Sequence, residues 1–270
     1  MGFVTQVLLF SIGLFVGILL FIEIGRRIGI AHLAREERGL TKGVEAAEGA
    51  VFGLLALLIA FTFFGAASRF DDRRHLVADE ANAIGTAYLR LDLLPADAQP
   101  ELRALFRRYL ELRLVTYRNV EDSVSTQAKL DAGSALQKEI WTQAVRACQR
   151  PETSAPAMTL LLTSLTEMFD ITDTRVAATR NHPPRIVYWL LGSLCLIAGL
   201  LVGYATSLNP DRSWLHMFVF ATILSLTVYV TIEIEYPRMG LIRVDSADQA
   251  LIDLRSQLQQ VTPEGRPPPG

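Results

Sequence analysis

The chain has 270 residues, of which 50% are hydrophobic, and its mean hydropathy is +0.28. This composition favours an integral membrane protein over a soluble single domain. The formal net charge is only −2, with acidic and basic residues interspersed. That balance excludes the strong positive field that gathers nucleic acid, so no nucleic-acid partner is expected.

Four apolar runs contain no Asp, Glu, Lys or Arg, and each is at least 20 residues long: residues 1–22, 49–68, 186–210 and 213–232. About 20 apolar residues cross the hydrocarbon core as a helix, and a helix satisfies its own backbone groups in lipid. The first run has neither a basic segment before it nor an A-x-A cleavage pattern, so it is predicted to be a retained helix. The sequence therefore predicts an all-α integral membrane protein with four transmembrane helices in a lipid bilayer.

A polar segment separates the second run from the third, which divides the chain into four parts. Residues 1–68 hold transmembrane helices 1 and 2 with their loop, residues 69–185 form a helical extramembrane domain, residues 186–235 hold transmembrane helices 3 and 4, and residues 236–270 form a C-terminal tail. The domain begins with a helical seam, whose apolar members recur at steps of four and three: Val77, Ala81, Ile84, Tyr88 and Leu91. Neither Pro nor Gly separates Ser68 from Ala83, so this helix is expected to continue directly from the second span.

Prolines divide the rest of the domain. Pro95 ends the first helix, and Pro100 is tolerated in the first turn of a second helix. Five residues of the second helix recur at helical spacing and share one face: Leu102, Leu105, Tyr109, Leu112 and Thr116. Further helices are expected over residues 134–149 and 156–181, the last ended by His182-Pro183-Pro184, and a short helix over 247–260. Residues 263–270 are expected to be disordered.

Four spans return the chain to its starting face, so the N-terminus, the domain and the C-terminus share one side of the membrane. Lys and Arg near the span ends divide almost evenly between the two faces, with a small excess on the domain side. The positive-inside rule therefore gives only a small preference for a cytoplasmic domain and C-terminus.

No catalytic motif is present. The chain has no phosphate-binding loop, no G-x-G-x-x-G and no G-x-S-x-G, its four histidines are scattered, and Cys148 and Cys195 lie in a polar and an apolar segment. No enzyme activity, cofactor or metal site is predicted. Four acidic residues that open the domain, Asp71, Asp72, Asp79 and Glu80, could hold a hard cation, or could form the solvated face of a helix that leaves the membrane.

The second span carries two ridges at helical spacing. Small residues form one: Gly49, Gly53, Ala56, Ala60 and Ala67. Bulky residues and a serine form the other: Leu54, Leu57, Phe61, Phe64 and Ser68. The small ridge predicts a close helix contact, as do Gly13-x-x-x-Gly17 and Gly199-x-x-x-Gly203. The ring ridge could constrict a pore that closes by dewetting, or its rings could face lipid or pack in a core.

Ionisable residues avoid the middle of every span, which argues against a proton-coupled transporter. Four glutamates stand at the span ends: Glu23, Glu48, Glu233 and Glu235. They are candidates for an ion vestibule. The alternative interpretation places them at the level of the lipid headgroups, solvated or paired with arginines such as Arg26.

Three stretches carry a family resemblance: GAVFGLLALLIAFTFFGAASRFDDRR, EANAIGTAYLRLDLLP and EYPRMGLIRV. With the order of the elements, they resemble the bestrophin-like family of bacterial membrane proteins of unknown function. The resemblance implies a homo-oligomer in the bacterial inner membrane, with five copies as one candidate stoichiometry, distantly similar to bestrophin ion channels. It further implies that the second spans surround the axis, with Phe61 and Phe64 as neck candidates and Thr62 and Ser68 as polar lining.

The chain is shorter than the eukaryotic bestrophins and lacks an identifiable calcium-binding acidic cluster, so calcium gating and anion selectivity are not carried over. Two hypotheses follow. The first is an oligomeric channel or pore for inorganic ions with a hydrophobic neck on the second span. The second is a membrane-anchored interaction or sensory scaffold that acts through the helical domain.

Overall fold

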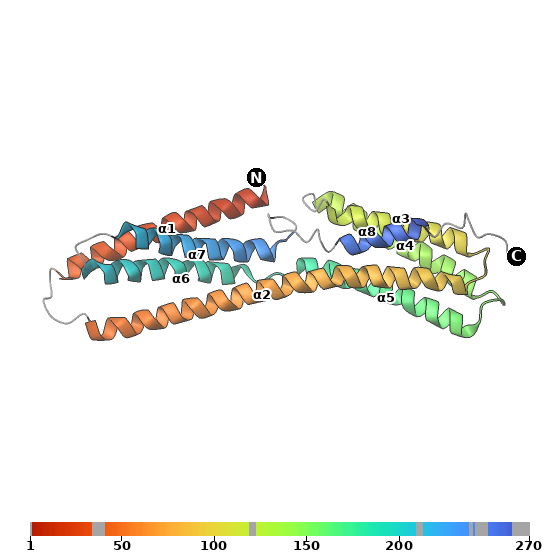
Figure 1. Ribbon diagram of the computed structural model, residues 1–270, viewed down its shortest axis with the longest axis horizontal. Coiled ribbons are helices and arrows are strands. Elements are labelled where there is room, and N and C mark those ends of the chain that lie inside the picture. Colours follow the sequence, from red (N-terminus) through yellow and green to blue (C-terminus); the bar gives the residue numbers. More distant parts are fainter. Residues whose placement is uncertain are drawn as a thin grey trace. The chain divides into compact units, whose positions relative to one another are not determined.

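The computed structural model of the protein describes residues 2–33, 41–118, 123–208, 213–237, 240 and 248–260, and Figure 1 shows how its helices are arranged. Every regular element among them is helical, which confirms the predicted all-α class. The α-helices are α1 (Phe3–Leu33), α2 (Thr41–Leu89), α3 (Gln99–Arg118), α4 (Ser123–Cys148), α5 (Ala155–Arg180), α6 (Arg185–Ala205), α7 (Trp214–Glu235) and α8 (Gln249–Gln260). Two short 3₁₀ helices, η1 (Arg90–Leu93) and η2 (Thr206–Leu208), follow α2 and α6.

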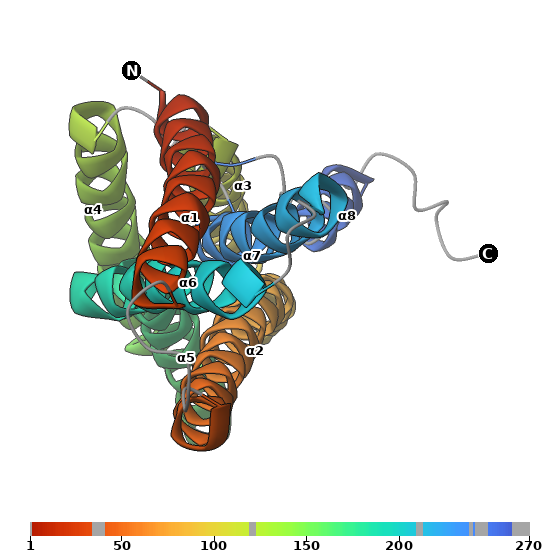
Figure 2. The ribbon, with the colours of Figure 1, turned by 90° about the vertical axis from the view of Figure 1, so that its left-hand side faces the viewer.

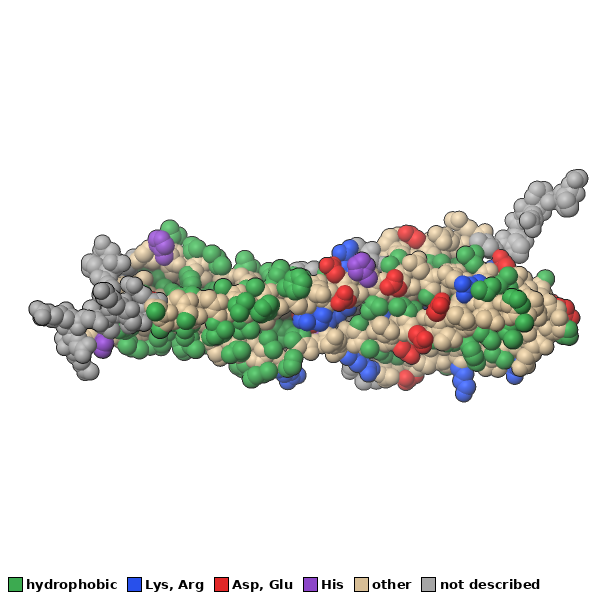
Figure 3. Space-filling model, turned by 90° about the horizontal axis from the view of Figure 1, so that it is seen from below, with side chains coloured by type: hydrophobic (Ala, Val, Ile, Leu, Met, Phe, Trp, Pro, Cys, Tyr) green, Lys and Arg blue, Asp and Glu red, His purple; other side chains and the backbone are tan. Residues whose placement is uncertain are grey.

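The chain divides into two compact units. One, here called the membrane unit, comprises Met1–Phe70 and His182–Ile242, and the other, the domain unit, comprises Asp71–Asn181 and Arg243–Gly270. Four helical stretches are long and apolar enough to cross a membrane, as predicted: Phe3–His32, Ala46–Leu93, Ala155–Ala205 and Trp214–Glu235. On the face drawn in Figure 3, hydrophobic side chains form an extended belt over the membrane unit, whereas charged side chains are scattered over the domain unit.

Within the membrane unit, α1, α6 and α7 pack side by side around a core that includes Ile18, Ile22, Cys195, Ala198 and Val228. The first helix runs through the charged residues after Ile22 and ends at Leu33, beyond the charge-free run. In Figures 1 and 2 the N-terminal end of α2 stands apart from this three-helix bundle.

Glycines bring α1 and α6 into backbone contact. A methyl group at Gly203 would overlap the carbonyl oxygen of Ile22, and one at Gly25 would overlap that of Leu200. At Gly199 it would lie 3.1 Å from the carbonyl oxygen of Ile18. The predicted contact at Gly199-x-x-x-Gly203 is therefore confirmed, and Gly25-x-x-x-Gly29 of α1 adds to it.

The other predicted small-residue pair in α1 is only half confirmed. A methyl group at Gly17 would lie 3.0 Å from the Leu196 side chain, whereas nothing lies within 4 Å of one at Gly13. One small residue is enough to admit the leucine, and Gly13 faces open space among the described residues.

The domain unit is built on the predicted seam of α2. Its five members, Val77, Ala81, Ile84, Tyr88 and Leu91, are all buried, as expected for a packed helix face. The same core receives residues of α3, α4 and α5, and Leu251, Leu254 and Leu258 of α8. The last helix is thus part of the domain core, although the sequence placed it in a separate tail.

Helix α4 begins at Ser123, earlier than the predicted start at residue 134. Gly133 lies inside the helix, and a methyl group there would make an ordinary contact, at 3.9 Å, with the Leu112 side chain of α3. Packing of α4 against α3 offsets the low helix propensity of glycine at this position. The predicted disorder of residues 263–270 lies outside the described residues.

Candidate functional site

The membrane half of α2 touches its own chain along one narrow stripe. Between residues 46 and 68 only Leu55 and Ala66 are buried. Phe52, Leu58 and Ile59 pack partly against the core of α1, α6 and α7. Buried residues make up 11% of this span, against 28% to 39% for the other three. Most of the α2 surface is therefore available to lipid or to another chain.

The predicted ring ridge lies on this open surface. Phe61 is 67% exposed and Phe64 is 73% exposed, and Leu54, Leu57 and Ser68 of the same row are exposed as well. All five members of the row are thus exposed among the described residues. Exposure of the rings is compatible with a lumen, with lipid and with another chain, so their role as a neck stays a prediction.

Among the described residues, the first four members of the small ridge of α2 make no close contact, unlike the glycines of α1 and α6, and Ala67 is half-buried. Nothing lies within 4 Å of a methyl group placed at Gly49 or Gly53, and Ala56 and Ala60 are exposed. The predicted helix contact is therefore not met inside one chain. Small residues fit a close approach, but their spacing carries no information about which chain supplies the partner.

The two polar lining candidates differ. The Thr62 hydroxyl lies 2.8 Å from the Leu58 carbonyl oxygen and 3.0 Å from that of Ile59, so the hydroxyl hydrogen is donated to the helix itself. Ser68 is exposed at the end of the ring row. Of the two, Ser68 has the freer hydroxyl to offer an ion.

The four edge glutamates separate into two kinds. Glu23 is half-buried and its carboxylate lies 3.0 Å from Arg27 Nε on the same helix, the arrangement that the alternative interpretation expects. Glu48 is half-buried near the start of α2. Glu233 and Glu235, by contrast, are fully buried at the end of α7. Two carboxylates removed from water need polar partners, because burial of an unpaired charge is costly.

Glu235 finds those partners in Arg69 and His182. The Arg69 guanidinium donates from Nε and Nη2 to Glu235 Oε2, at 2.9 Å and 2.7 Å. His182 Nδ1 lies 2.9 Å from Glu235 Oε1, and its ring stacks on Tyr236 at 4.3 Å between centroids. Three distant parts of the chain thus meet at one carboxylate, and sequence reasoning missed the cluster because no local spacing links them.

Glu233 is seated against the backbone after α7. A methyl group at Gly240 would overlap the Glu233 carboxylate, so a larger residue there would displace that carboxylate. Tyr229, one turn earlier on α7, hydrogen-bonds to the same carboxylate. This contact gives a physical reason for the glycine in EYPRMGLIRV.

The four acidic residues at the start of the domain do not converge. Asp71, Asp72 and Asp79 are exposed, and Asp71 pairs with Arg74 at 3.7 Å. Glu80 instead points into the core and is fully buried. In the part of the chain that the structure describes, no group of three His, Cys, Asp or Glu residues could hold a metal ion.

Two arginines enclose the Glu80 carboxylate. Arg113 Nε donates to Oε1 at 2.5 Å, and Arg175 Nη1 pairs with Oε2. Burial alone would raise the pKa of Glu80, but the guanidiniums of Arg113 and Arg175 outweigh it and hold this pKa below its ordinary value. Arg175 also reaches Asp248, just before α8, at 3.4 Å. The cluster ties α2, α3, α5 and the C-terminal segment together and is a structural centre.

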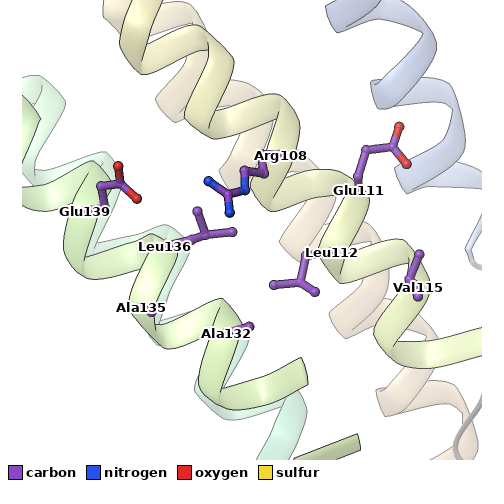
Figure 4. A pocket seen from close by; sticks show the side chains of 8 residues that line it. All are labelled: Arg108, Glu111, Leu112, Val115, Ala132, Ala135, Leu136 and Glu139. Carbon is purple, nitrogen blue, oxygen red and sulfur yellow. The ribbon is translucent and has the colours of Figure 1, made fainter. Parts of the chain in front are cut away.

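Helices α3 and α4 also border a groove of about 450 Å³. Leu112 and Leu136 face one another across it, and the charged side chains of Arg108 and Glu139 stand at its rim (Figure 4). The remaining lining residues are Glu111, Val115, Ala132 and Ala135. Its walls are mostly apolar, as in surfaces that bind small amphipathic ligands or helices.

Comparison with known proteins identifies the family of the chain and agrees with its helical fold. Residues 9–265 match the bestrophin-like domain family. None of the curated proteins matches the chain.

Solved structures of variants of a bacterial bestrophin homologue from Klebsiella pneumoniae share the fold. One is 14% identical with a TM-score of 0.69, covering 91% of this chain and 98% of its own. A second is 16% identical with a TM-score of 0.68, covering 92% and 99%. A third is 15% identical with a TM-score of 0.65, covering 89% and 98%. The likeness therefore extends over nearly the whole length of both proteins.

Proposed function

We propose that this chain, which belongs to the bestrophin-like family, assembles with copies of itself into an ion channel whose α2 helices surround the conduction axis. Phe61 and Phe64 form the hydrophobic neck of that channel. The observation that supports this most directly is the open membrane half of α2, whose ring row stays exposed in the part of the chain that the structure describes.

The membrane half of α2 carries three stripes. In a ring of copies such a helix would have three neighbours, namely the passage, the bundle of its own chain and the next copy. The small stripe includes Gly53 and Ala60, the ring stripe follows one residue later with Leu54 and Phe61, and the stripe that packs on the bundle follows one further with Leu55 and Thr62. One residue turns an α-helix by about 100°. The ring stripe therefore lies between the stripe bound to its own chain and the stripe left for a neighbouring copy.

A hydrophobic constriction can stop ions without a charged gate. Water leaves a narrow apolar passage, and an ion that crosses it loses hydration without compensation. In this proposal Ser68 provides polar lining at one end of the row, Thr62 borders the lining, and Glu23 and Glu48 are vestibule candidates. In this proposal Glu233 and Glu235 do not line the passage, because both are buried within their own chain.

The test is current through the purified protein in planar bilayers. Replacement of Phe61 and Phe64 by Ala should widen the neck and raise the current. Leu20→Ala, which trims an exposed side chain of α1, is the matched control and should change nothing. Absence of current under every voltage and gradient tried, together with no effect of the double substitution, would rule the channel out.

The preferred location is the bacterial inner membrane, with the domain unit and the C-terminus in the cytoplasm. The small excess of basic residues on the domain side supports this orientation. A reporter at the C-terminus that is active only in the cytoplasm should then give signal, and signal from a periplasm-specific reporter instead would reverse the orientation.

The groove between α3 and α4 favours a second candidate function, an interaction scaffold. An apolar groove with charged rim residues is suited to an amphipathic partner helix. In the full-length protein, Ala132→Arg and Ala135→Arg would fill the groove. Loss of a specific co-purifying partner with unchanged current would assign the groove to that role, and unchanged co-purification would remove it.

A further inference from the structure

We propose that Arg69, held by the buried carboxylate of Glu235, sets the rotational angle of α2 and thereby aims Phe61 and Phe64. Arg69 is a positioning residue in this proposal, which rests on the proposed channel. It acts through the helix and does not touch the ions. All members of the contact lie in the membrane unit.

Apolar packing alone gives α2 little angular definition. The stripe that packs on α1, α6 and α7 contains only two buried residues, Leu55 and Ala66. Apolar burial is non-directional, so neighbouring angles of the helix would bury similar area. A directed bond at the end of this half adds the angular preference that its apolar stripe lacks.

The Arg69 contact has the required direction. Two guanidinium nitrogens donate to the Glu235 carboxylate, at 2.7 Å and 2.9 Å for Oε2 and 3.1 Å for Oε1. A planar fork facing a carboxylate fixes orientation as well as distance, which a lysine ammonium does not. The Arg69 side chain also folds back over its own helix, because a methyl group at Gly65 would lie 3.2 Å from Nη1.

Glu235 is itself immobilised. It is fully buried, and its second oxygen is engaged by His182 at 2.9 Å, whose ring stacks on Tyr236. A buried carboxylate keeps its cation because separation would leave an unpaired charge in an apolar surrounding. The anchor on α7 is therefore held by contacts other than those with α2.

The ring row depends on this angle. Phe64 and Arg69 are five residues apart, which places them about 140° apart around the helix. The anchor therefore pulls one side of α2 onto α7 while Phe64 points away from it. A rotation by one residue would replace Phe64 with Phe63 in the same direction.

Thiol chemistry can measure the rotation. Phe64→Cys and Phe63→Cys are made separately in the full-length protein, in which Cys148 and Cys195 are both buried. Each is combined with native Arg69, with Arg69→Lys, and with the neutral pair Arg69→Met and Glu235→Gln. The readouts are the modification rate with a charged thiosulfonate and copper-catalysed cross-linking between copies. Arg74→Met, which removes an exposed α2 arginine paired with Asp71, is the control.

With native Arg69, the thiol at 64 should react fast and cross-link, and the thiol at 63 should not. In the neutral pair the rate at 64 should fall about tenfold as the thiol loses access to water, while the rate at 63 rises. Arg69→Lys should lie between the two. Arg74→Met should leave both rates unchanged.

Unchanged rates in a neutral pair that still elutes as the native oligomer would overturn the positioning role and leave the channel intact. If that pair does not assemble, Arg69→Lys decides in the same way, and unchanged rates there also overturn it. A thiol at 64 that neither reacts nor cross-links with native Arg69 would instead refute the channel, and the positioning role with it.

Discussion

The two halves of α2 differ more from one another than most separate helices do. In the domain unit one face of the helix is packed, and its seam members Val77, Ala81, Ile84 and Tyr88 are all buried. In the membrane unit the same helix buries only Leu55 and Ala66 between residues 46 and 68, and the others are half-buried or exposed. Helical periodicity identified a face in each half. Among the described residues, only the face in the domain unit is packed against other helices of the same chain. Periodicity therefore predicts which residues share a face but not which chain that face contacts.

Each half of α2 also takes part in ionic contacts with a buried carboxylate, with the charges reversed. In the membrane half, α2 supplies the cation, Arg69, to Glu235. In the domain half, α2 supplies the anion, Glu80, to Arg113 and Arg175. The domain pair adds to an extensive core, whereas the membrane pair is the main directed contact of a half that is otherwise loosely held. Substitutions should therefore act on stability in one half and on orientation in the other.

The largest effect is expected for Glu80→Ala. It leaves two buried guanidiniums without their carboxylate, and such a loss costs about 3–5 kcal/mol. Thermal unfolding in detergent measures it, with the neighbouring exposed residue in Asp79→Ala as the control. A small change in Tm for Glu80→Ala would mean that the domain half is not the firmly held one.

The contrast between the halves can be tested by the same kind of truncation in each. Ile84→Ala removes a fully buried side chain and should cost about 2–5 kcal/mol. Leu57→Ala trims a side chain that is 51% exposed, and should change the unfolding free energy by about 0.5 kcal/mol or less. Equal losses of Tm for the two variants would contradict the comparison.

Acid should weaken the domain half by a smaller amount than Glu80→Ala. Because the folded pKa of Glu80 lies below its ordinary value of 4.5, its contribution to stability is complete above that value. The contribution is lost as the pH falls through the lower folded pKa. Tm should therefore fall with acidification, and less steeply in Glu80→Gln. Parallel Tm profiles for the two proteins would show that Glu80 does not carry the effect.

The smallest effect on stability is expected for Phe61→Ala and Phe64→Ala. Both rings are exposed within the chain, so their removal should change the free energy of unfolding by about 0.5 kcal/mol or less. Current should change while Tm does not. A large drop in Tm would place the rings in a packed contact between copies and outside a water-filled lumen.

Much of the helical framework followed from the sequence, because spans and seams depend on local residue order. The four spans, the buried seam and the contact at Gly203 were predicted from spacing alone. The buried cluster around Glu235 was not, since Arg69 and His182 are 166 and 53 residues away along the chain. Glu80 was misplaced among the exposed acids because its partners, Arg113 and Arg175, lie on other helices. Long-range pairing of charges leaves no periodic signal in a sequence.

Helix α8 lies at the end of the chain yet completes a core that begins at Val77. Leu251, Leu254 and Leu258 pack with residues that emerge from the ribosome long before them. Between the two stretches of core, α6 and α7 have to enter the bilayer. The core of the domain unit is therefore complete only after residue 258 has been synthesised, later than the last two spans. Truncated products that end before residue 249 would retain all four spans but leave the apolar surface that α8 covers accessible to quality-control proteases.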